Sequence, residues 1–353
     1  MAEPRVVLYP ADVTACGGYR MLLPVAALEA EGFTLGCYPP GHPKRLQAEV
    51  TVDRFGVQHC RRVVDPEADV VVFQRPLSRL FYEAMVHMKS NGVKIVIELD
   101  DDFKALSPRH GAYRLVHPRY SPHSNWEWLD KALGVADLLV AATPNLARRY
   151  GRRTESVVVP NRVPSSFLDI ARPPATTAPK LGWAGTMESH PADVQVMRGG
   201  VAEALRAAGL DTLHVVGPGT GVSESLGVPV TATGWVPYAD YADHVVHLDV
   251  GLAPLEQSTF NDSKSWLKPL EYAALGIPGV GSPSAEYRRL RDEHGIGFIA
   301  EKPSQWRGLL RMLLNDHDAR AAESARLRTA VVEEGLTIEA TAKEWWNAWT
   351  SVL

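Results

Sequence analysis

Short runs of aliphatic and β-branched residues alternate with longer helical patterns along the whole chain. Runs that are apolar at nearly every position are typical of strands buried on both faces, as in parallel sheets covered by helices. The expected strands are 5–9, 33–38, 70–74, 94–99, 138–142, 156–159, 180–184, 213–216, 228–233, 250–254, 279–281 and 295–300. Helical periods lie between them, for example over 21–30, 192–208 and 266–275. The alternation predicts an α/β fold with two doubly wound sheets.

A proline-rich stretch separates the two series of strands. Residues 160–179 contain five prolines, Pro174 among them, with Thr and Ala between, a composition typical of a connection between domains. At 353 residues the chain is long enough for two domains. We therefore expect a first Rossmann-like domain over 1–165 and a second over 166–335. The remaining segment, 336–353, is expected to form a helix whose three tryptophans pack against a large surface.

Composition excludes several classes of protein. Hydrophobic residues make up 45% of the chain and charged residues 22%, as in soluble globular proteins, and no apolar run is long enough for a transmembrane segment. The N-terminus is too weakly basic for a secretory signal, and the three cysteines have no metal-ligand spacing, so we expect a cytoplasmic protein. A net charge of −4 does not by itself indicate nucleic-acid binding.

The most informative segment covers residues 260–278. A polar turn with Ser263 and Lys264 opens a helical pattern that ends at a Gly-x-Pro turn. A helix N-terminus beside Lys264 and Lys268 suits a diphosphate, because free N–H groups and two ammonium groups converge there. Glu271, one turn further on, can accept hydrogen bonds from ribose hydroxyls.

This segment resembles the donor-site helix of GT-B glycosyltransferases, in which a Lys-Ser turn precedes Leu-Glu-Tyr and Gly-x-Pro. Three other segments resemble parts of the same donor domain. Residues 181–193 resemble its first strand and loop, 234–238 the stretch that meets the nucleobase, and 249–255 the strand leading to the sugar diphosphate.

The chain departs from the GT-B pattern at two places. Retaining members often carry two glutamates separated by seven residues, and Ser263 stands where the first of them would be. The Arg and Lys that often grip the donor phosphates are also absent from the loop after the first donor-domain strand, where Thr186, Ser189 and His190 stand instead.

The resemblance implies two doubly wound Rossmann-like domains facing a cleft, with the C-terminal helix crossing back to the first domain. It also implies transfer of a sugar from a UDP- or GDP-linked donor to an acceptor hydroxyl, with retention of configuration and without a metal or other cofactor. A glycine pair after the first strand is expected to let the backbone approach the donor closely. The expected donor-binding residues are Gly17, Gly18, Gly185, Thr186, His190, Trp235, Val236, Ser263, Lys264, Lys268 and Glu271.

Three adjacent carboxylates follow a buried strand, at the end where α/β sheets place their ligands. Because Asp100, Asp101 and Asp102 repel one another, at least one is expected to have a raised pKa or a cationic partner. GT-B enzymes have an acceptor-side catalytic residue at this place, so Asp100 and Asp101 are candidates for the base that takes the acceptor's proton. Asp100 and Asp102 also form an Asp-x-Asp, which binds a metal in another glycosyltransferase fold. A metal-dependent transferase is therefore an alternative.

Basic and aromatic residues are interleaved without any acidic residue over 103–126. Such a mixture suits a polyanion with stackable rings, such as DNA, and also a sugar polymer. An ordered loop with snorkelling arginines is the simpler alternative. The candidate acceptor-binding residues are Arg109, Arg114, Arg119, Tyr113, Tyr120 and Trp126.

The acidic triplet and the donor loop also resemble sequences of enzymes from actinobacteria and their phages. The acceptors expected in that setting are a hydroxymethylated DNA base, a virion protein or a cell-surface glycan, and a phage-encoded protein would act in the host cytoplasm. Two further functions stay open. One is a non-catalytic scaffold of the same fold that binds a sugar or a partner. The other is a nucleotide-sugar oxidoreductase or epimerase, although the chain lacks a convincing Gly-x-Gly-x-x-Gly.

Overall fold

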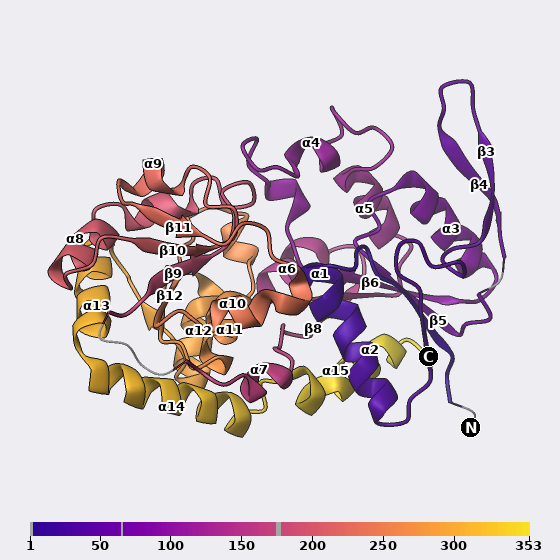
Figure 1. Cartoon of the computed structure of the whole chain (residues 1–353). Helices are drawn as coiled ribbons and strands as arrows, with labels where there is room; N and C mark the ends of the chain where they lie inside the picture. Colours follow the sequence, from indigo (N-terminus) through magenta and orange to yellow (C-terminus); the bar gives the residue numbers. More distant parts are fainter. Residues whose placement is uncertain (1–2, 65, 174–177) are drawn as a thin grey trace. The chain divides into compact units, whose positions relative to one another are not determined.

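The computed structural model describes residues 3–64, 66–173 and 178–353. Pro174 and the three residues after it, within the predicted connection, lie outside the described residues. The chain divides into two compact units, which are coloured along the sequence in Figure 1. Unit 1 comprises Met1–Pro108, Ala112–Asn161 and Ile338–Leu353, and unit 2 comprises Arg109–Gly111 and Arg162–Thr337.

Unit 1 is built on a six-stranded parallel sheet in the order β2-β1-β5-β6-β7-β8. Its strands are β1 Val6–Tyr9, β2 Leu35–Cys37, β5 Val70–Gln74, β6 Lys94–Leu99, β7 Leu138–Ala141 and β8 Glu155–Val158. Strands β1, β5 and β7 are buried at every position, which accounts for their uninterrupted apolar sequences. The strand order reverses between β1 and β5, and α/β sheets bind ligands outside the carboxyl ends of strands at such a point.

Helices cover both faces of this sheet (Figure 1). Helix α2 packs against the C-terminal helix α15, which also contacts β5 and β7, while α3 packs against α5 and β6. The bounds are α1 Ala15–Gly17, η1 Gly18–Leu22, α2 Leu23–Ala30, α3 Arg79–Ser90, η2 Phe103–Ala105, α4 Tyr113–Val116, α5 Trp126–Leu133, α6 Pro144–Tyr150 and α15 Ile338–Thr350.

The C-terminal helix is tied to unit 1 through a buried ion pair. Glu98, at the end of β6, is fully buried, and its Oε2 accepts hydrogen bonds from Nε and Nη2 of Arg20 at 3.1 and 2.8 Å. Its Oε1 accepts a hydrogen bond from Nε1 of Trp349 at 3.0 Å. The Arg20 guanidinium also lies over the Trp345 ring, 5.5 Å from its centre. Two tryptophans of α15 therefore contact a charge pair in the core of unit 1.

An antiparallel hairpin, β3 Ala48–Val52 and β4 Gln58–Val63, is inserted between β2 and β5, and the apolar patterns of the sequence do not predict it. Its strands are largely exposed and rich in polar residues, so they lack the continuous apolar pattern of the sheet strands. The pairing shifts register between Glu49 and Val50.

Unit 2 contains a second six-stranded parallel sheet, in the order β11-β10-β9-β12-β13-β14. Counted within the unit, this is the 3-2-1-4-5-6 order of a Rossmann sheet, and its reversal lies between β9 and β12. The strands are β9 Leu181–Ala184, β10 Leu213–Val216, β11 Val230–Ala232, β12 Val250–Ala253, β13 Gly279–Gly281 and β14 Phe298–Ile299.

Two hydrophobic clusters pack around the strands of the second sheet. One includes side chains of α8 and α13, and the other includes side chains of α10, α11, α12 and α14. The helices are α7 Ser166–Asp169, η3 Asp193–Met197, α8 Gly200–Ala207, α9 Val222–Leu226, η4 Tyr238–Asp240, α10 Tyr241–Val245, η5 Asn261–Ser263, α11 Leu267–Ala274, α12 Ala285–His294, α13 Pro303–Asn315 and α14 His317–Glu333. Among the described residues, no helix has both the length and the apolar composition needed to cross a bilayer.

The prediction of one continuous helix over 192–208 is wrong. Residues 192–208 form the 3-10 turn η3 and then α8, because the chain turns at Gly199, whose φ of 82° favours glycine.

Candidate functional site

Asp193 joins two loops at the reversal point of the unit 2 sheet. Its side chain is buried, and Oδ2 lies 2.6 Å from Nδ1 of His190, in the loop after β9. Oδ1 accepts hydrogen bonds from the backbone N–H of Glu256 at 2.8 Å and from Nδ2 of Asn261 at 2.7 Å. Since Glu256 and Asn261 lie between β12 and α11, one carboxylate fixes the loops that follow β9 and β12.

The His190 ring is half-buried, and contacts with Trp183 and Asp193 fix its orientation. The edge of its ring meets the Trp183 ring, with centroids 6.1 Å apart and an interplanar angle of 83°. Because Nδ1 faces Asp193, Nε2 is the ring nitrogen left for a ligand. The predicted donor residues Gly185 and Thr186 lie in the same loop, where the Thr186 carbonyl accepts a hydrogen bond from the His190 N–H at 3.0 Å.

Tyr272 joins β9 to β12 where the two strands end. Its hydroxyl donates to the carbonyl of Leu252 at 3.0 Å and accepts from the N–H of Ala184 at 3.1 Å. The ring passes over Gly251 so closely that a Cβ there would lie 2.6 Å from it. Glycine in this strand is therefore explained by the close approach of the tyrosine.

The polar turn before α11 is not the first turn of that helix but a separate 3-10 turn, η5, followed by an extended residue. Ser263 is buried in η5, and Lys264 is extended, with its ammonium 4.5 Å from the centre of the Phe260 ring. Helix α11 begins at Leu267, and the side chain of its N-cap residue, Trp266, makes no capping hydrogen bond. The amide groups of that turn and the Lys264 ammonium are thus two separate sources of positive potential.

Lys268 and Glu271 bind each other inside unit 2. Lys268 Nζ lies 2.8 Å from Glu271 Oε2, and the hydroxyl of Tyr241 donates to the same oxygen at 2.9 Å. Burial opposes the charge on Lys268, but the charge and hydrogen bond of Glu271 together with the nearby Tyr272 and Tyr287 raise the Lys268 pKa. Burial and then the charge of Glu271 hold the pKa of Tyr241 well above its ordinary value. Both predicted donor residues therefore already take part in a charged network with the Tyr241 hydroxyl.

The two residues predicted to meet the nucleobase differ in environment. Trp235, which follows β11, is 74% exposed, so its ring is a free platform for stacking. Val236 instead packs against the hydrophobic cluster that contains α10 and α11.

The acidic triplet of unit 1 does not act as one group. Asp102 is fully buried, accepts a hydrogen bond from the Tyr150 hydroxyl at 2.7 Å, and pairs with Arg149 through its other oxygen. Burial and then the charge of Asp102 raise the pKa of Tyr150. Asp102 is thus held apart as a structural acid, which does not favour a metal site made of Asp100 and Asp102.

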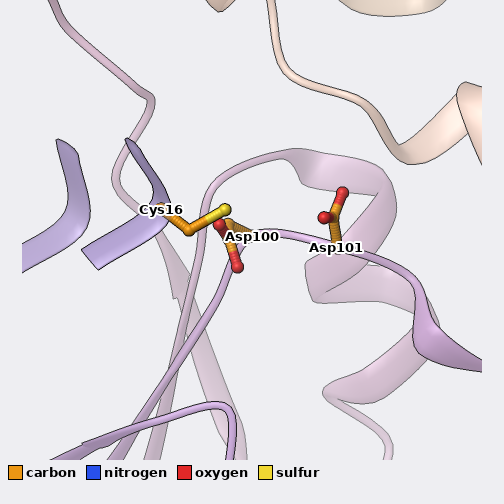
Figure 2. Close-up of side chains that lie close together, drawn as sticks. All are labelled: Cys16, Asp100 and Asp101. Atoms are coloured by element: carbon orange, nitrogen blue, oxygen red, sulfur yellow. The ribbon is translucent and has the colours of Figure 1, made fainter. Parts of the chain in front are cut away.

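Asp100 and Asp101 instead lie near Cys16, at the reversal point of the unit 1 sheet. One ligand atom from each of the three residues lies within 4.8 Å of the other two, and Figure 2 shows the Cys16 sulfur beside the Asp100 carboxylate, with Asp101 further along the chain. Asp100 Oδ1 lies 3.9 Å from Nε of Arg75, the cationic neighbour expected for the triplet.

Arg75 has an unusual backbone conformation and lies between two carboxylates, Asp12 and Asp100. It has φ of 47°, rare for a residue with a side chain, and it pairs with Asp12. Burial opposes ionisation of Asp12, but hydrogen bonds from Thr14 and the charge of Arg75 lower its pKa. A strained residue among charged groups at a strand end is common in functional sites.

Metal binding at Cys16, Asp100 and Asp101 is opposed by two features of the cluster. Burial, and then the negative charge of Asp100, raises the pKa of the Cys16 thiol well above its ordinary value, whereas a metal ligand must be a thiolate. The Arg75 guanidinium, 3.9 Å from Asp100 Oδ1, also places a competing positive charge beside that carboxylate. A metal at these three residues would therefore require the Cys16 thiol to lose its proton.

The predicted glycine loop is part of a helix. Gly17 ends α1 and Gly18 begins the π-helical turn η1, both with helical φ. A Cβ on Gly17 would lie 1.9 Å from the carbonyl oxygen of Asp12, so glycine is required by this contact. In this structure Gly17 is thus approached closely by the backbone of Asp12.

The predicted acceptor residues separate into two groups. Arg109 lies in the short segment assigned to unit 2, while the others lie in unit 1. There Tyr113, His117 and Tyr120 form a ring cluster with centroids 4.8 to 6.1 Å apart. The guanidinium groups of Arg114 and Arg119 lie 5.5 and 5.7 Å from the Tyr120 ring. Trp126 meets this cluster through His117 at 6.4 Å.

Five residues of these sites were not predicted from the sequence to be site residues: Asp12, Cys16, Arg75, Asp193 and Asn261. The position of Asp193 three residues after His190 is a usable signal, because that spacing can place both side chains together on one turn. The others come together through strand order, which local patterns do not reveal.

No protein-family model and no curated protein matches the sequence, whereas solved structures do. A glycosyltransferase from Rickettsia africae is 13% identical, with a TM-score of 0.64 and 99% of each chain covered. Sucrose-phosphate synthase from Thermosynechococcus elongatus is 12% identical, with a TM-score of 0.63 and the same coverage. The chain has the GT-B fold. The Anabaena HepE protein, solved with UDP, is 12% identical, with a TM-score of 0.58, covering 99% of this chain and 100% of that one.

Proposed function

We propose that the protein is a glycosyltransferase, which moves a sugar from a nucleotide-sugar donor bound by unit 2 to an acceptor hydroxyl presented by unit 1. The observation that carries this proposal is the Asp193 network, which holds His190 and the segment before α11 together at the reversal point of a Rossmann sheet. The GT-B fold supports the same function, and the UDP bound to the Anabaena protein makes UDP-linked sugars the first donors to test.

On the donor side, we assign the diphosphate to the amide groups at the start of α11, the Lys264 ammonium and Nε2 of His190. These groups would supply hydrogen bonds and positive charge in place of the Arg and Lys of the GT-B pattern, which are absent from the loop after β9. We assign stacking on the nucleobase to Trp235, because its ring is exposed. We assign the ribose hydroxyls to Glu271, whose Oε2 also binds Lys268 and Tyr241.

On the acceptor side, Asp101 is the proposed base, while Asp100 is held beside Arg75. The acceptor hydroxyl would lose its proton to Asp101 as its oxygen bonds to the anomeric carbon, and the bond from that carbon to the diphosphate would break. The donor-side groups would stabilise the charge on the leaving diphosphate. We propose that this step needs no metal and that the acceptor oxygen approaches on the same face from which the diphosphate leaves, so that the anomeric configuration is retained.

The proposal is tested by incubating the protein with UDP- and GDP-sugars and three acceptors: hydroxymethylated DNA, a glycan and a protein. Mass spectrometry should detect one acceptor heavier by a single sugar, and NMR of the product should show the anomeric configuration of the donor. Unchanged acceptors and intact donors, with nucleotide binding still measurable, would support a non-catalytic scaffold instead.

A further inference from the structure

Unit 2 contains a small cavity at the amino ends of β12 and β13, the edge of the sheet opposite to the loops that follow β9 and β12. It has a volume of about 190 Å³ and lies between α14 and the residues that precede the two strands. This volume is below the range of sites that hold a whole small molecule, so the cavity suits one compact chemical group. The residues that the following argument uses are Arg172, Asp249, Gly276, Arg320, Ala321 and Ser324.

Arg320 brings a buried positive charge to this cavity. It is 8% exposed, and its Nη1 donates to the carbonyls of Leu313 and Leu314 at the end of α13, both at 2.8 Å. Within the part of the chain that the structure describes, Nε and Nη2 donate to no other group and the guanidinium pairs with no carboxylate. The carbonyls of α13 offset part of the charge. A buried cation with unused N–H groups is nevertheless costly, and an anion in the cavity would stabilise it.

A second guanidinium lies at the same cavity. Arg172 donates to the carbonyl of Gly276 at 2.6 Å, and its Nη2 lies 3.4 Å from Oδ1 of Asp249. Burial lowers the pKa of Arg172, and the charges of Arg328 and Arg320 lower it further. Asp249 acts in the opposite direction, but it is the single carboxylate that lines the cavity among the described residues. Positive charge therefore exceeds negative charge here.

One side of α14 supplies the remaining groups. The residues of this helix that line the cavity are 317, 320, 321 and 324, a spacing that places them on one face. Ser324 is close to the end of α11, because a Cβ on Gly276 would lie 2.7 Å from its Oγ. The Ser324 hydroxyl can donate to a ligand oxygen. Neutral and charged donors thus line one small space.

We propose that this cavity binds a phosphate group, whose oxygens accept hydrogen bonds from the Arg320 guanidinium and the Ser324 hydroxyl. A phosphate monoester carries a charge of about −1.5 to −2 at pH 7, which matches the excess of positive charge. Its tetrahedral oxygens also accept from donors on several sides, whereas a carboxylate is planar. Inorganic phosphate and a small phosphate monoester share this chemistry. The site is separate from the donor loops and does not depend on the proposed function.

A bound phosphate would stabilise unit 2. Arg172 contacts the end of α11, and Arg320 contacts the end of α13, so an anion between them would strengthen the packing of both helices on α14. Any ligand that binds only the folded state raises the temperature of unfolding. Binding can therefore be followed by calorimetry and by thermal unfolding.

The test titrates the full chain with inorganic phosphate, glycerol 3-phosphate and acetate at constant ionic strength. At least one phosphate compound should bind, and acetate should bind at least tenfold more weakly. Arg320→Gln should lower the affinity for phosphate by tenfold or more. Arg326 is exposed on the same helix and also donates to a backbone carbonyl, that of Gly295, so Arg326→Gln is the matched control and should bind as wild type does.

A second pair of variants leaves every arginine in place. Ala321 is exposed on α14 and lines the cavity, so Ala321→Glu places a negative charge there and should weaken phosphate binding by about tenfold. Ala322→Glu changes the neighbouring exposed residue, which does not line the cavity, and gives the protein the same net charge. It should keep the wild-type affinity and the rise in unfolding temperature with phosphate.

The outcomes decide where phosphate binds. Tighter binding of either phosphate compound supports the site and identifies the source of the group. If wild type binds neither compound, if acetate binds equally well, or if Ala321→Glu and Ala322→Glu bind alike, the inference is wrong. Phosphate binding that is lost in Lys264→Ala and kept in Ala321→Glu would also overturn it, because the anion would then lie at the donor segment.

Discussion

Asp193 Oδ1 accepts a hydrogen bond from Asn261 Nδ2 at 2.7 Å, across 68 positions of sequence. The bond fixes the Asn261 amide, and it fixes a loop that follows β12 to one that follows β9. Because the same carboxylate also orients His190, a change at Asp193 is expected to disturb several contacts together. Effects within such a network are not additive, so the contribution of each Asp193 contact is measured by changing its partner, His190 or Asn261, alone.

Lys264→Ala is expected to weaken binding of the donor and of the free nucleoside diphosphate by ten- to a hundredfold. It removes a charge-assisted hydrogen bond of roughly 1.5–3 kcal/mol to the diphosphate. Calorimetry measures both affinities, and circular dichroism checks that the fold is kept. Lys180→Ala, an exposed lysine of the same unit, is the control and should bind as wild type does. Equal affinities for the two variants would contradict the phosphate assignment.

Lys268→Met is expected to destabilise unit 2 by about 3 kcal/mol, because it leaves the buried Glu271 carboxylate without its partner. Glu271→Leu should cost less, because the side chain of Lys268 is 29% exposed. The double variant should recover most of that loss, since it removes both charges. Urea denaturation followed by fluorescence gives the free energy of unfolding for all four proteins. Additive losses in the double variant would mean that the two side chains do not interact as the structure places them.

Asp101→Asn is expected to lower kcat by about a hundredfold or more and to leave donor affinity unchanged, because a base acts only in the chemical step. Glu127→Gln, an exposed change in the same unit, should have no effect on turnover. A chelator should not affect the wild-type rate if the transfer is metal-independent. Wild-type turnover by Asp101→Asn would remove this residue from the mechanism.

Acceptor binding by the ring cluster should depend on salt if the acceptor is DNA. Each phosphate neutralised by an arginine contributes about −0.9 to the slope of log affinity against log salt on a duplex. Replacing Arg114 and Arg119 together with Ala should therefore flatten the slope by roughly 2, whereas replacing the exposed Arg206 should not. A flat response in wild type, with binding lost on Tyr120→Ala, would identify a neutral glycan or protein acceptor instead.

Glu98→Leu is expected to lower the free energy of unfolding by about 3–5 kcal/mol, since it leaves the buried Arg20 without its carboxylate. The hydrogen bond of Trp349 is lost in the same change, so its indole N–H should exchange with solvent deuterium faster than in wild type. Glu49→Gln on the exposed hairpin is the control for both measurements. An unfolding midpoint equal to that of the control would mean that the ion pair does not anchor α15.

Patterns in the sequence predict the sheet strands well where both faces are buried. Continuous apolar runs at 70–74 and 94–99 match β5 and β6. The same patterns do not predict β3 and β4, because these strands are largely exposed and polar. They also treat 192–208 as a single helix, because the apolar period continues across the turn that Gly199 makes.

The contacts between side chains in the sites are harder to predict from the sequence than the strands are. Residue types place Lys268 and Glu271 correctly on one helix, but only the packing of Tyr241 against them reveals that they bind each other. Likewise, Asp100, Asp101 and Asp102 look alike in sequence. They differ in the structure because Tyr150 and Arg149 engage Asp102, while Asp100 faces Arg75. Such differences depend on residues that are distant along the chain.

The position of α15 has a consequence for the order of folding during synthesis. The ribosome makes the six strands of the first sheet before those of the second, yet α15, which packs against α2 and contacts Glu98, is made only after both sheets. Until then the apolar face of α2 and the Arg20–Glu98 pair lack part of their cover. We expect the nascent first unit to be open to chaperones and proteases for as long as the second is being translated, and to close only once α15 has left the ribosome.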